Sequence, residues 1–170
     1  MKKAKVLSLF FILLFNSSLF FGQQKIDSLS YYSKLSDSPE KITDLSTSYR
    51  FFNNYLKIVL HKKDTTSAIY ALWYKASIEH QTGFYYDSEK TSINALKLSD
   101  RVKPTAYLKV LRKGIFNHLG IIYRKKGNIN KAINLYNRAL ILSESKKDSA
   151  IIFNNTANVH KDNNDLKSAK

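Results

Sequence analysis

Apolar residues recur at intervals of three and four positions along the chain, most clearly over residues 108–140. One run consists of Leu108, Leu111, Ile115, Leu119 and Ile122, and the next consists of Ile129, Ala132, Ile133, Tyr136 and Leu140. This spacing matches the 3.6-residue period of an amphipathic α-helix, and no stretch alternates with the period of two that a half-buried strand requires. Only two prolines and five glycines interrupt the 170 residues. The pattern therefore predicts an all-α protein made of long helices joined by short turns.

The expected helix ends carry a repeated polar signal. Lysines precede an aspartate in HKKDTT at 61–66 and in SKKDSA at 145–150. Cations stabilise the negative C-terminal end of a helix dipole, and a capping side chain satisfies free N–H groups at the start of the next helix. The residues expected at helix starts are Asp64, Thr105, Asn130 and Asp148. Gly127 follows three basic residues and is expected to adopt the left-handed conformation that ends a helix.

The chain also contains an internal repeat. A shift of 37 positions places Phe116, Asn117, Gly120 and Ala132 on Phe153, Asn154, Ala157 and Ala169. A shift of 44 positions in the other direction places Gly120, Ile122, Gly127, Ala139, Leu140 and Leu142 on Ala76, Ile78, Gly83, Ala95, Leu96 and Leu98. These alignments predict three copies of one helix–turn–helix unit.

The unit resembles the tetratricopeptide repeat, in which small and aromatic residues follow at fixed offsets. The matching positions of the best copy are Phe116, Leu119, Gly120, Tyr123, Ala132, Tyr136 and Ala139. The later copy keeps Phe153, Ala157 and Ala169, and the earlier copy keeps Ala76, Gly83 and Ala95. Both degenerate copies depart from the pattern, with Thr156 and His160 in the later one and Glu79 in the earlier one at positions where Leu or Tyr is usual.

This resemblance implies a right-handed superhelical solenoid of antiparallel helix pairs. Small residues let paired helices approach, so Gly120 is expected to face Ala132, while Ala139 receives the first helix of the next unit. The aromatic rings of Phe116, Tyr123 and Tyr136 would then fill the core. The repeating region is expected over 62–170, with units at about 69–99, 113–145 and 150–170, the last one incomplete. Residues 23–61 are expected to form a degenerate helical pair that caps the array.

The first residues predict an exported protein. Three lysines within 2–5 precede the charge-free stretch VLSLFFILLFNSSLFFG at 6–22. A basic head, an apolar stretch of about 10 residues and small polar residues are typical of a secretory signal peptide. We expect cleavage near Gly22 and a periplasmic or extracellular location. An uncleaved anchor is the alternative.

The charge balance leaves two interpretations of the partner open. The chain has 28 basic and 13 acidic residues, and removal of residues 1–22 leaves 25 against 13, a formal charge of about +12. One interpretation is an anionic partner such as nucleic acid or polysaccharide. The other is a uniformly lysine-rich composition without functional meaning. We favour the second, because the cations form neither a block nor a single stripe.

Motifs for catalysis and metal binding are missing from the sequence. The absence of cysteine excludes disulfides, thiolate metal sites and thiol nucleophiles. The histidines His61, His80, His118 and His160 lack the spacing of a zinc hydrolase helix and are interpreted as surface or groove residues. No glycine-rich phosphate loop or nucleophile elbow occurs. We therefore expect neither enzymatic activity nor a cofactor.

The resemblance supplies the candidate site. In tetratricopeptide arrays the first helix of each unit lines the concave face, which implies a ligand groove of Asn117, Ile121, Arg124, Asn154, Asn158 and Lys161. Amides and cations of this kind can bind an extended peptide or its carboxylate. The lysine that carboxylate-clamp repeats have at the position of Asn117 is absent. A solvated helix face is the alternative interpretation.

The resulting hypothesis is a non-catalytic scaffold for protein interaction or sensing. The partner would be a protein or peptide, with membrane contact limited to the signal peptide or a downstream span. One alternative is the N-terminal extracytoplasmic sensor region of a membrane histidine kinase or regulator whose output domain lies beyond residue 170. A second alternative is a basic protein that binds an anionic polymer.

Overall fold

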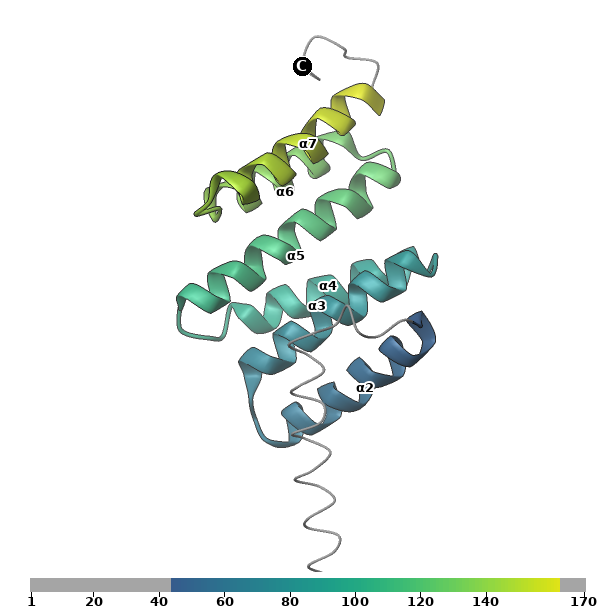
Figure 1. Cartoon of the computed structure of the whole chain (residues 1–170), viewed down its shortest axis with the longest axis vertical. Coiled ribbons are helices and arrows are strands. Elements are labelled where there is room, and N and C mark those ends of the chain that lie inside the picture. Colours follow the sequence, from purple (N-terminus) through teal and green to yellow (C-terminus); the bar gives the residue numbers. More distant parts are fainter. Residues whose placement is uncertain (1–43, 163–170) are drawn as a thin grey trace, which may run out of the picture. The chain divides into compact units, whose positions relative to one another are not determined.

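A computed structural model describes residues 44–162, which contain six α-helices and no strand (Figure 1). The helices are α2 (Leu45–His61), α3 (Thr65–Gln81), α4 (Tyr85–Ser99), α5 (Ala106–Lys125), α6 (Ile129–Ile141) and α7 (Lys146–Asp162). The predicted all-α class is confirmed. The expected signal peptide over 1–22, the first helix of the pair expected over 23–61 and Ala169 lie outside the described residues.

Consecutive helices form antiparallel pairs joined by short turns. The most extensive packing joins α3 with α4 and α5 with α6, and α2 and α7 pack on α3 and α6. Figure 1 shows the helices following one another from α2 in blue to α7 in yellow. Within residues 44–162, none of the helices combines the length and the hydropathy needed to cross a bilayer.

The core is centred on α5. The five apolar residues that the sequence pattern placed on one face of this helix, Leu108, Leu111, Ile115, Leu119 and Ile122, are all buried. They pack with side chains from α3, α6 and α7 in one hydrophobic cluster. The amphipathic pattern therefore identified the core face of α5 correctly.

Two glycines of α5 each accommodate one large aromatic ring. A Cβ atom at Gly120 would overlap the ring of Tyr136, and a Cβ atom at Gly114 would overlap the indole of Trp73. Tyr136 is fully buried. The sequence named Ala132 as the neighbour of Gly120, whereas the nearest atoms belong to Tyr136. The missing Cβ thus makes room for a ring rather than for a second small residue.

Three turns share one backbone arrangement. Gly83 and Gly127 have positive φ angles of 88° and 72°, and Lys63 has a φ of 57°. After Gly127, the N–H of Asn128 donates to the carbonyl of Tyr123 at 2.9 Å, and the N–H of Gly127 donates to that of Arg124 at 2.9 Å. This is the Schellman arrangement that closes a helix with a left-handed residue. The prediction for Gly127 is confirmed.

The helix starts confirm two of the predicted caps and correct two others. Asp64 and Thr105 accept hydrogen bonds from the N–H groups of Ser67 and Leu108 at 3.1 and 3.0 Å. At α6 the capping residue is Asn128 and not Asn130, because the left-handed Gly127 closes α5 at once and lets the next helix begin immediately.

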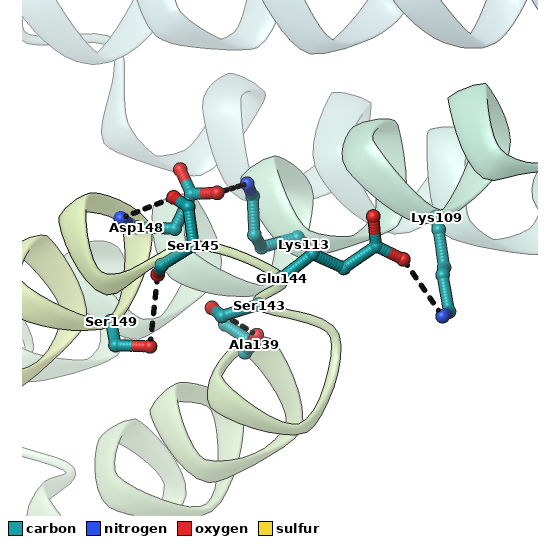
Figure 2. Close-up of polar contacts among 8 residues, drawn as sticks. All are labelled: Lys109, Lys113, Ala139, Ser143, Glu144, Ser145, Asp148 and Ser149. Carbon is teal, nitrogen blue, oxygen red and sulfur yellow. Dashed lines mark hydrogen bonds and ion pairs between the residues drawn. The ribbon is translucent and has the colours of Figure 1, made fainter.

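At α7 the cap is Ser145, whose Oγ accepts from the N–H of Asp148 at 3.1 Å (Figure 2). Asp148 lies in the first turn of the helix, not at its start as expected. There its carboxylate accepts from Lys113 of α5 at 2.7 Å. Glu144, on the other side of Ser145, pairs with Lys109 at 2.9 Å. Figure 2 shows both lysines of α5 reaching this connection, which therefore has direct polar contacts with α5.

Candidate functional site

The first helices of successive pairs contact one another. Although α4 and α6 intervene in sequence, α3 packs on α5 and α5 packs on α7. We call the surface formed by α3, α5 and α7 the first-helix face. It carries the predicted groove residues on α5 and α7.

Three polar contacts join α5 to α7 along this face. Besides Lys113 with Asp148, the Nδ2 of Asn155 donates to Oδ1 of Asn117 at 2.8 Å, and Nε of Arg124 lies 3.7 Å from a carboxylate oxygen of Asp162. We call these six residues the α5–α7 seam. The seam therefore places amide and charged side chains at three points along the first-helix face, where a ligand was predicted.

The predicted groove residues fall into two groups. Asn117 and Arg124 belong to the seam, while Ile121 is half-buried against the hydrophobic core. On α7, Asn154 and Lys161 are exposed and Asn158 is half-buried. The α7 residues that reach α5 are instead Asn155 and Asp162. Binding of a ligand by the six predicted residues stays a prediction.

Arg124 has hydrogen-bonding capacity left over. Its side chain is 16% exposed, and its buried Nε has no hydrogen-bond partner in the described part of the chain. The ion pair with Asp162 is long, and the Asp162 side chain is 54% exposed. A guanidinium presents five donors in a planar fork that matches a carboxylate. Arg124 can therefore donate hydrogen bonds to a ligand carboxylate in competition with Asp162.

Sequence reasoning missed Trp73 on the same face. Trp73 is half-buried on α3, and its indole occupies the space that a Cβ atom at Gly114 of α5 would need. The shift of 44 positions that aligns Gly120 with Ala76 also aligns Asn117 with Trp73. This alignment could have identified Trp73 as a residue of the first-helix face. The first-helix face thus changes from aromatic on α3 to amide and charged on α5 and α7.

A buried polar cluster lies between α3, α4 and α5. His118 is 7% exposed, and its Nε2 lies 3.0 Å from the Oγ of Ser88. The prediction of a surface or groove position for His118 is wrong, because the small side chain of Ser88 leaves room for the imidazole. His80 is half-buried, and its ring lies 5.4 Å from that of His118. Burial lowers the pKa of both histidines, that of His118 to about 4.

This cluster has the wrong hydrogen-bond direction for nucleophilic catalysis. The hydroxyl of Ser88 donates to the carbonyl of Ala76 at 2.7 Å, so it accepts from His118. A catalytic base must instead take the proton of the serine. The described residues also include no group of three or more histidine, aspartate or glutamate side chains that could hold a metal ion. We interpret the cluster as a structural hydrogen-bond network.

Glu79, next to His80 on α3, is a buried carboxylate with long contacts. It is 3% exposed, its Oε1 accepts from the Tyr49 hydroxyl at 3.5 Å, and Lys75 lies 3.8 Å away. Burial raises the pKa of its carboxyl group. Glu79 occupies the position where Tyr123 stands in the next unit, and the hydroxyl of Tyr123 donates to Glu89.

The repeat in this chain is similar to a known family. A family model described as tetratricopeptide repeat matches residues 114–145, which cover much of α5 and all of α6. The stretch 114–145 is a match to that repeat. No curated protein matches the chain.

The fold also matches a solved structure, the crystal structure of BtubC (BKLC) from P. vanneervenii. The TM-score is 0.66 at 20% sequence identity, and the match covers 83% of this chain. It covers 58% of the other chain, so this protein spans little more than half of that neighbour's length. At this identity the similarity concerns the fold alone. The fold is an all-α, tetratricopeptide-like solenoid of antiparallel helix pairs.

Proposed function

We propose that the protein is a non-catalytic scaffold that binds an extended protein segment on the first-helix face. Repeats of this type generally mediate protein–protein binding, because stacked units present a long continuous surface. The observation that carries the proposal is the α5–α7 seam, where Asn117 and Arg124 stand half-buried beside α7. The partly exposed guanidinium of Arg124, with its long ion pair to Asp162, supports a ligand with a carboxylate.

The ligand chemistry follows from the neighbours of the seam. Trp73 and the half-buried Ile121 offer apolar contact, and the amides offer hydrogen bonds to a peptide backbone. A suitable segment would place a carboxylate at Arg124 and an apolar side chain toward Trp73. The side chain of Asp162 would have to yield its long contact to the incoming carboxylate.

A displayed library of random peptides with free carboxyl termini tests this function. We expect selected peptides to lose about 10-fold or more in affinity for Arg124→Gln, because a charge-assisted hydrogen bond contributes about 1.5–3 kcal/mol. The control is Lys97→Gln, which removes an exposed cation from α4. Peptides that bind both variants as well as the unaltered protein would refute binding on the first-helix face.

From sequence features alone, we also propose that the protein is exported. The alternative function on the same basis is the sensor region of a membrane histidine kinase or regulator. The basic head and the apolar stretch over 6–22 support export. A sensor region would require a reading frame that continues into an apolar span of about 20 residues and an output domain. Anionic-polymer binding, the other alternative, requires retention on heparin resin well above physiological salt.

A further inference from the structure

The turn between α3 and α4 exposes three consecutive aromatic side chains. Phe84, Tyr85 and Tyr86 are 62%, 48% and 75% exposed. We call these residues the aromatic turn. Single exposed apolar residues are common, whereas contiguous exposed apolar patches mark contact with a partner or a membrane.

Comparison with the next turn shows that the backbone does not require these aromatic residues. The α5–α6 turn has the same left-handed glycine and carries Asn128, Ile129 and Asn130 at the corresponding positions. Asn128 caps its helix through a hydrogen bond to the N–H of Lys131 at 3.2 Å, whereas Phe84 makes no side-chain cap. The aromatic turn therefore gives up a stabilising cap and exposes apolar surface instead.

Lysines flank the aromatic turn. Lys126 Nζ donates to Glu89 at 2.6 Å, one turn along α4 from Tyr85. Lys125 is exposed and lies close enough to His80 to contribute to the lowered pKa of that imidazole. The His80 ring lies 5.2 Å from the ring of Tyr85. The carboxylate of Glu89 neutralises Lys126, and Asp87 in the first turn of α4 adds a further negative charge.

We propose that the aromatic turn docks on the surface of an anionic lipid bilayer. Tyrosine and phenylalanine rings partition into the headgroup region, where an apolar body and a polar tip are both accommodated. Lysines beside them attract anionic headgroups. The aromatic rings supply apolar contact. The exposed Lys125 and the exposed Lys90, one turn after Tyr86 on α4, supply charge complementarity.

Two other occupants fit the observations less well. The cores of protein interfaces are enriched in aromatic residues and arginine but depleted in lysine, and both flanking cations here are lysines. A second copy of the chain would bring together two molecules of formal charge +15, which repel each other.

A site-specific probe tests the proposal in the full chain. The sequence has no cysteine, so Gln81→Cys introduces a single attachment point for an environment-sensitive dye beside the aromatic turn. The probe is a vesicle of phosphatidylcholine with about one third phosphatidylglycerol. Insertion of residues 6–22 would tether the labelled chain and a variant of its aromatic turn equally, so the difference between them reports on the aromatic turn.

Two variants serve as controls. One is Phe84→Asn, Tyr85→Ile and Tyr86→Asn in the labelled chain, which copies the α5–α6 turn and should keep the helical circular dichroism spectrum. The other is Ile141→Cys, which moves the dye to an 81% exposed position at the end of α6.

We expect a blue shift of the Gln81→Cys dye with the anionic vesicles, weakened by added salt and at least about 10-fold less sensitive to lipid concentration in the triple variant. The dye at position 141 should not shift. The proposal is overturned if the Gln81→Cys dye does not shift, if the triple variant shifts equally, or if pure phosphatidylcholine gives the same response.

Discussion

The α3–α4 and α5–α6 pairs have the same turn geometry but different interiors. In α5–α6, Gly120 faces the large ring of Tyr136, and the surrounding buried residues are mostly Leu, Ile, Phe and Ala. In α3–α4, the corresponding positions are Ala76 and the fully buried Ser92, and α4 buries Ser88, Thr91 and Ser99 as well. The α5–α6 interior is filled by aliphatic and aromatic side chains, whereas α4 contributes mainly short polar side chains to the α3–α4 interior. The same helix pair can thus be built by two kinds of chemistry.

Truncation of Tyr136 should show the largest difference between the two pairs. Tyr136→Ala is expected to lower the free energy of unfolding by about 3–5 kcal/mol, because the buried ring leaves a cavity over Gly120. Ser92→Ala at the corresponding position should change it by less than about 1 kcal/mol, since the buried hydroxyl has no partner in the described residues. Urea denaturation measures both.

Tyr136→Phe is the control for that comparison. The Tyr136 hydroxyl is buried without a hydrogen-bond partner in the described part of the chain, and burial raises its pKa to about 12. Removal of the hydroxyl alone should therefore leave stability unchanged or higher. A similar loss for the Phe and Ala variants would contradict a role in packing.

Acidification should weaken the polar α3–α4 side of the molecule. His118 has a pKa of about 4 in the folded protein against 6.5 ordinarily, so the unfolded chain binds more protons between these values. Stability is present above about pH 6.5 and is lost as the pH falls toward about 4, by roughly 3 kcal/mol. The lowered pKa of His80 acts in the same direction.

Glu79 provides the opposing control. Its raised pKa means that protonation on acidification relieves the burial of a carboxylate, so Glu79→Gln should make the acid loss steeper. His118→Asn, which does not titrate, should make it shallower. Denaturation midpoints at about pH 7 and about pH 4.5 distinguish these cases. Equal pH dependence in His118→Asn and the unaltered protein would contradict the conclusion that His118 causes the loss of stability in acid.

Overpacking of Gly120 should give the next largest effect. Gly120→Ala is expected to cost about 1–3 kcal/mol because the new Cβ overlaps the Tyr136 ring, and Gly120→Leu should lower the melting temperature further. Adding Tyr136→Ser should remove most of the specific cost of Gly120→Ala, since this combination resembles the Ala76 and Ser92 arrangement of the other pair. Additive losses in thermal melts would show that the two positions do not oppose each other.

The three left-handed turn residues offer a comparison of backbone strain. Gly83→Ala and Gly127→Ala should each cost about 1 kcal/mol, although no atom lies within 4 Å of the added Cβ, because the cost comes from the positive φ. Lys63→Gly should have the opposite sign, since Lys63 already has a φ of 57°. Melting temperatures that move in the same direction for all three would refute the backbone explanation.

The smallest expected change tests the missing cap of α4. Phe84→Asn introduces the residue type that caps α6 and should stabilise the protein by about 0.5–1 kcal/mol. Chemical denaturation measures the gain. Combined with a weaker lipid response of the labelled chain, this gain would show that Phe84 trades stability for surface contact. A loss of stability would mean that the ring packs on its own turn.

The sequence predicts the α5–α6 pair far better than the α3–α4 pair, for a physical reason. Leu119, Gly120 and Tyr136 form a periodic apolar pattern that reflects their packing directly. The partners of buried polar groups are not visible in such a pattern, because Ser88 and His118 are 30 positions apart and look like surface residues. The buried network was therefore missed.

The positions of two candidate site residues were predicted and those of their contacts on α7 were not, while ligand binding stays a prediction. The repeat alignment placed Asn117 and Arg124 on the first-helix face, where the structure has them. Which residues of α7 meet them depends on how far α7 is shifted along α5, and the repeat spacing differs between 44 and 37 positions. The observed shift brings Asn155 and Asp162 to α5. A fixed offset of 37 positions instead predicts their neighbours Asn154 and Lys161.

The only tryptophan in the chain, Trp73, lies on Gly114 where the α3–α4 pair meets the α5–α6 pair. Its intrinsic emission therefore monitors this joint separately from the rest of the molecule. A ligand that bends or tightens the array would alter the solvation of the indole without any unfolding. The fluorescence of Trp73 can therefore report a change in the curvature of the array without an added label.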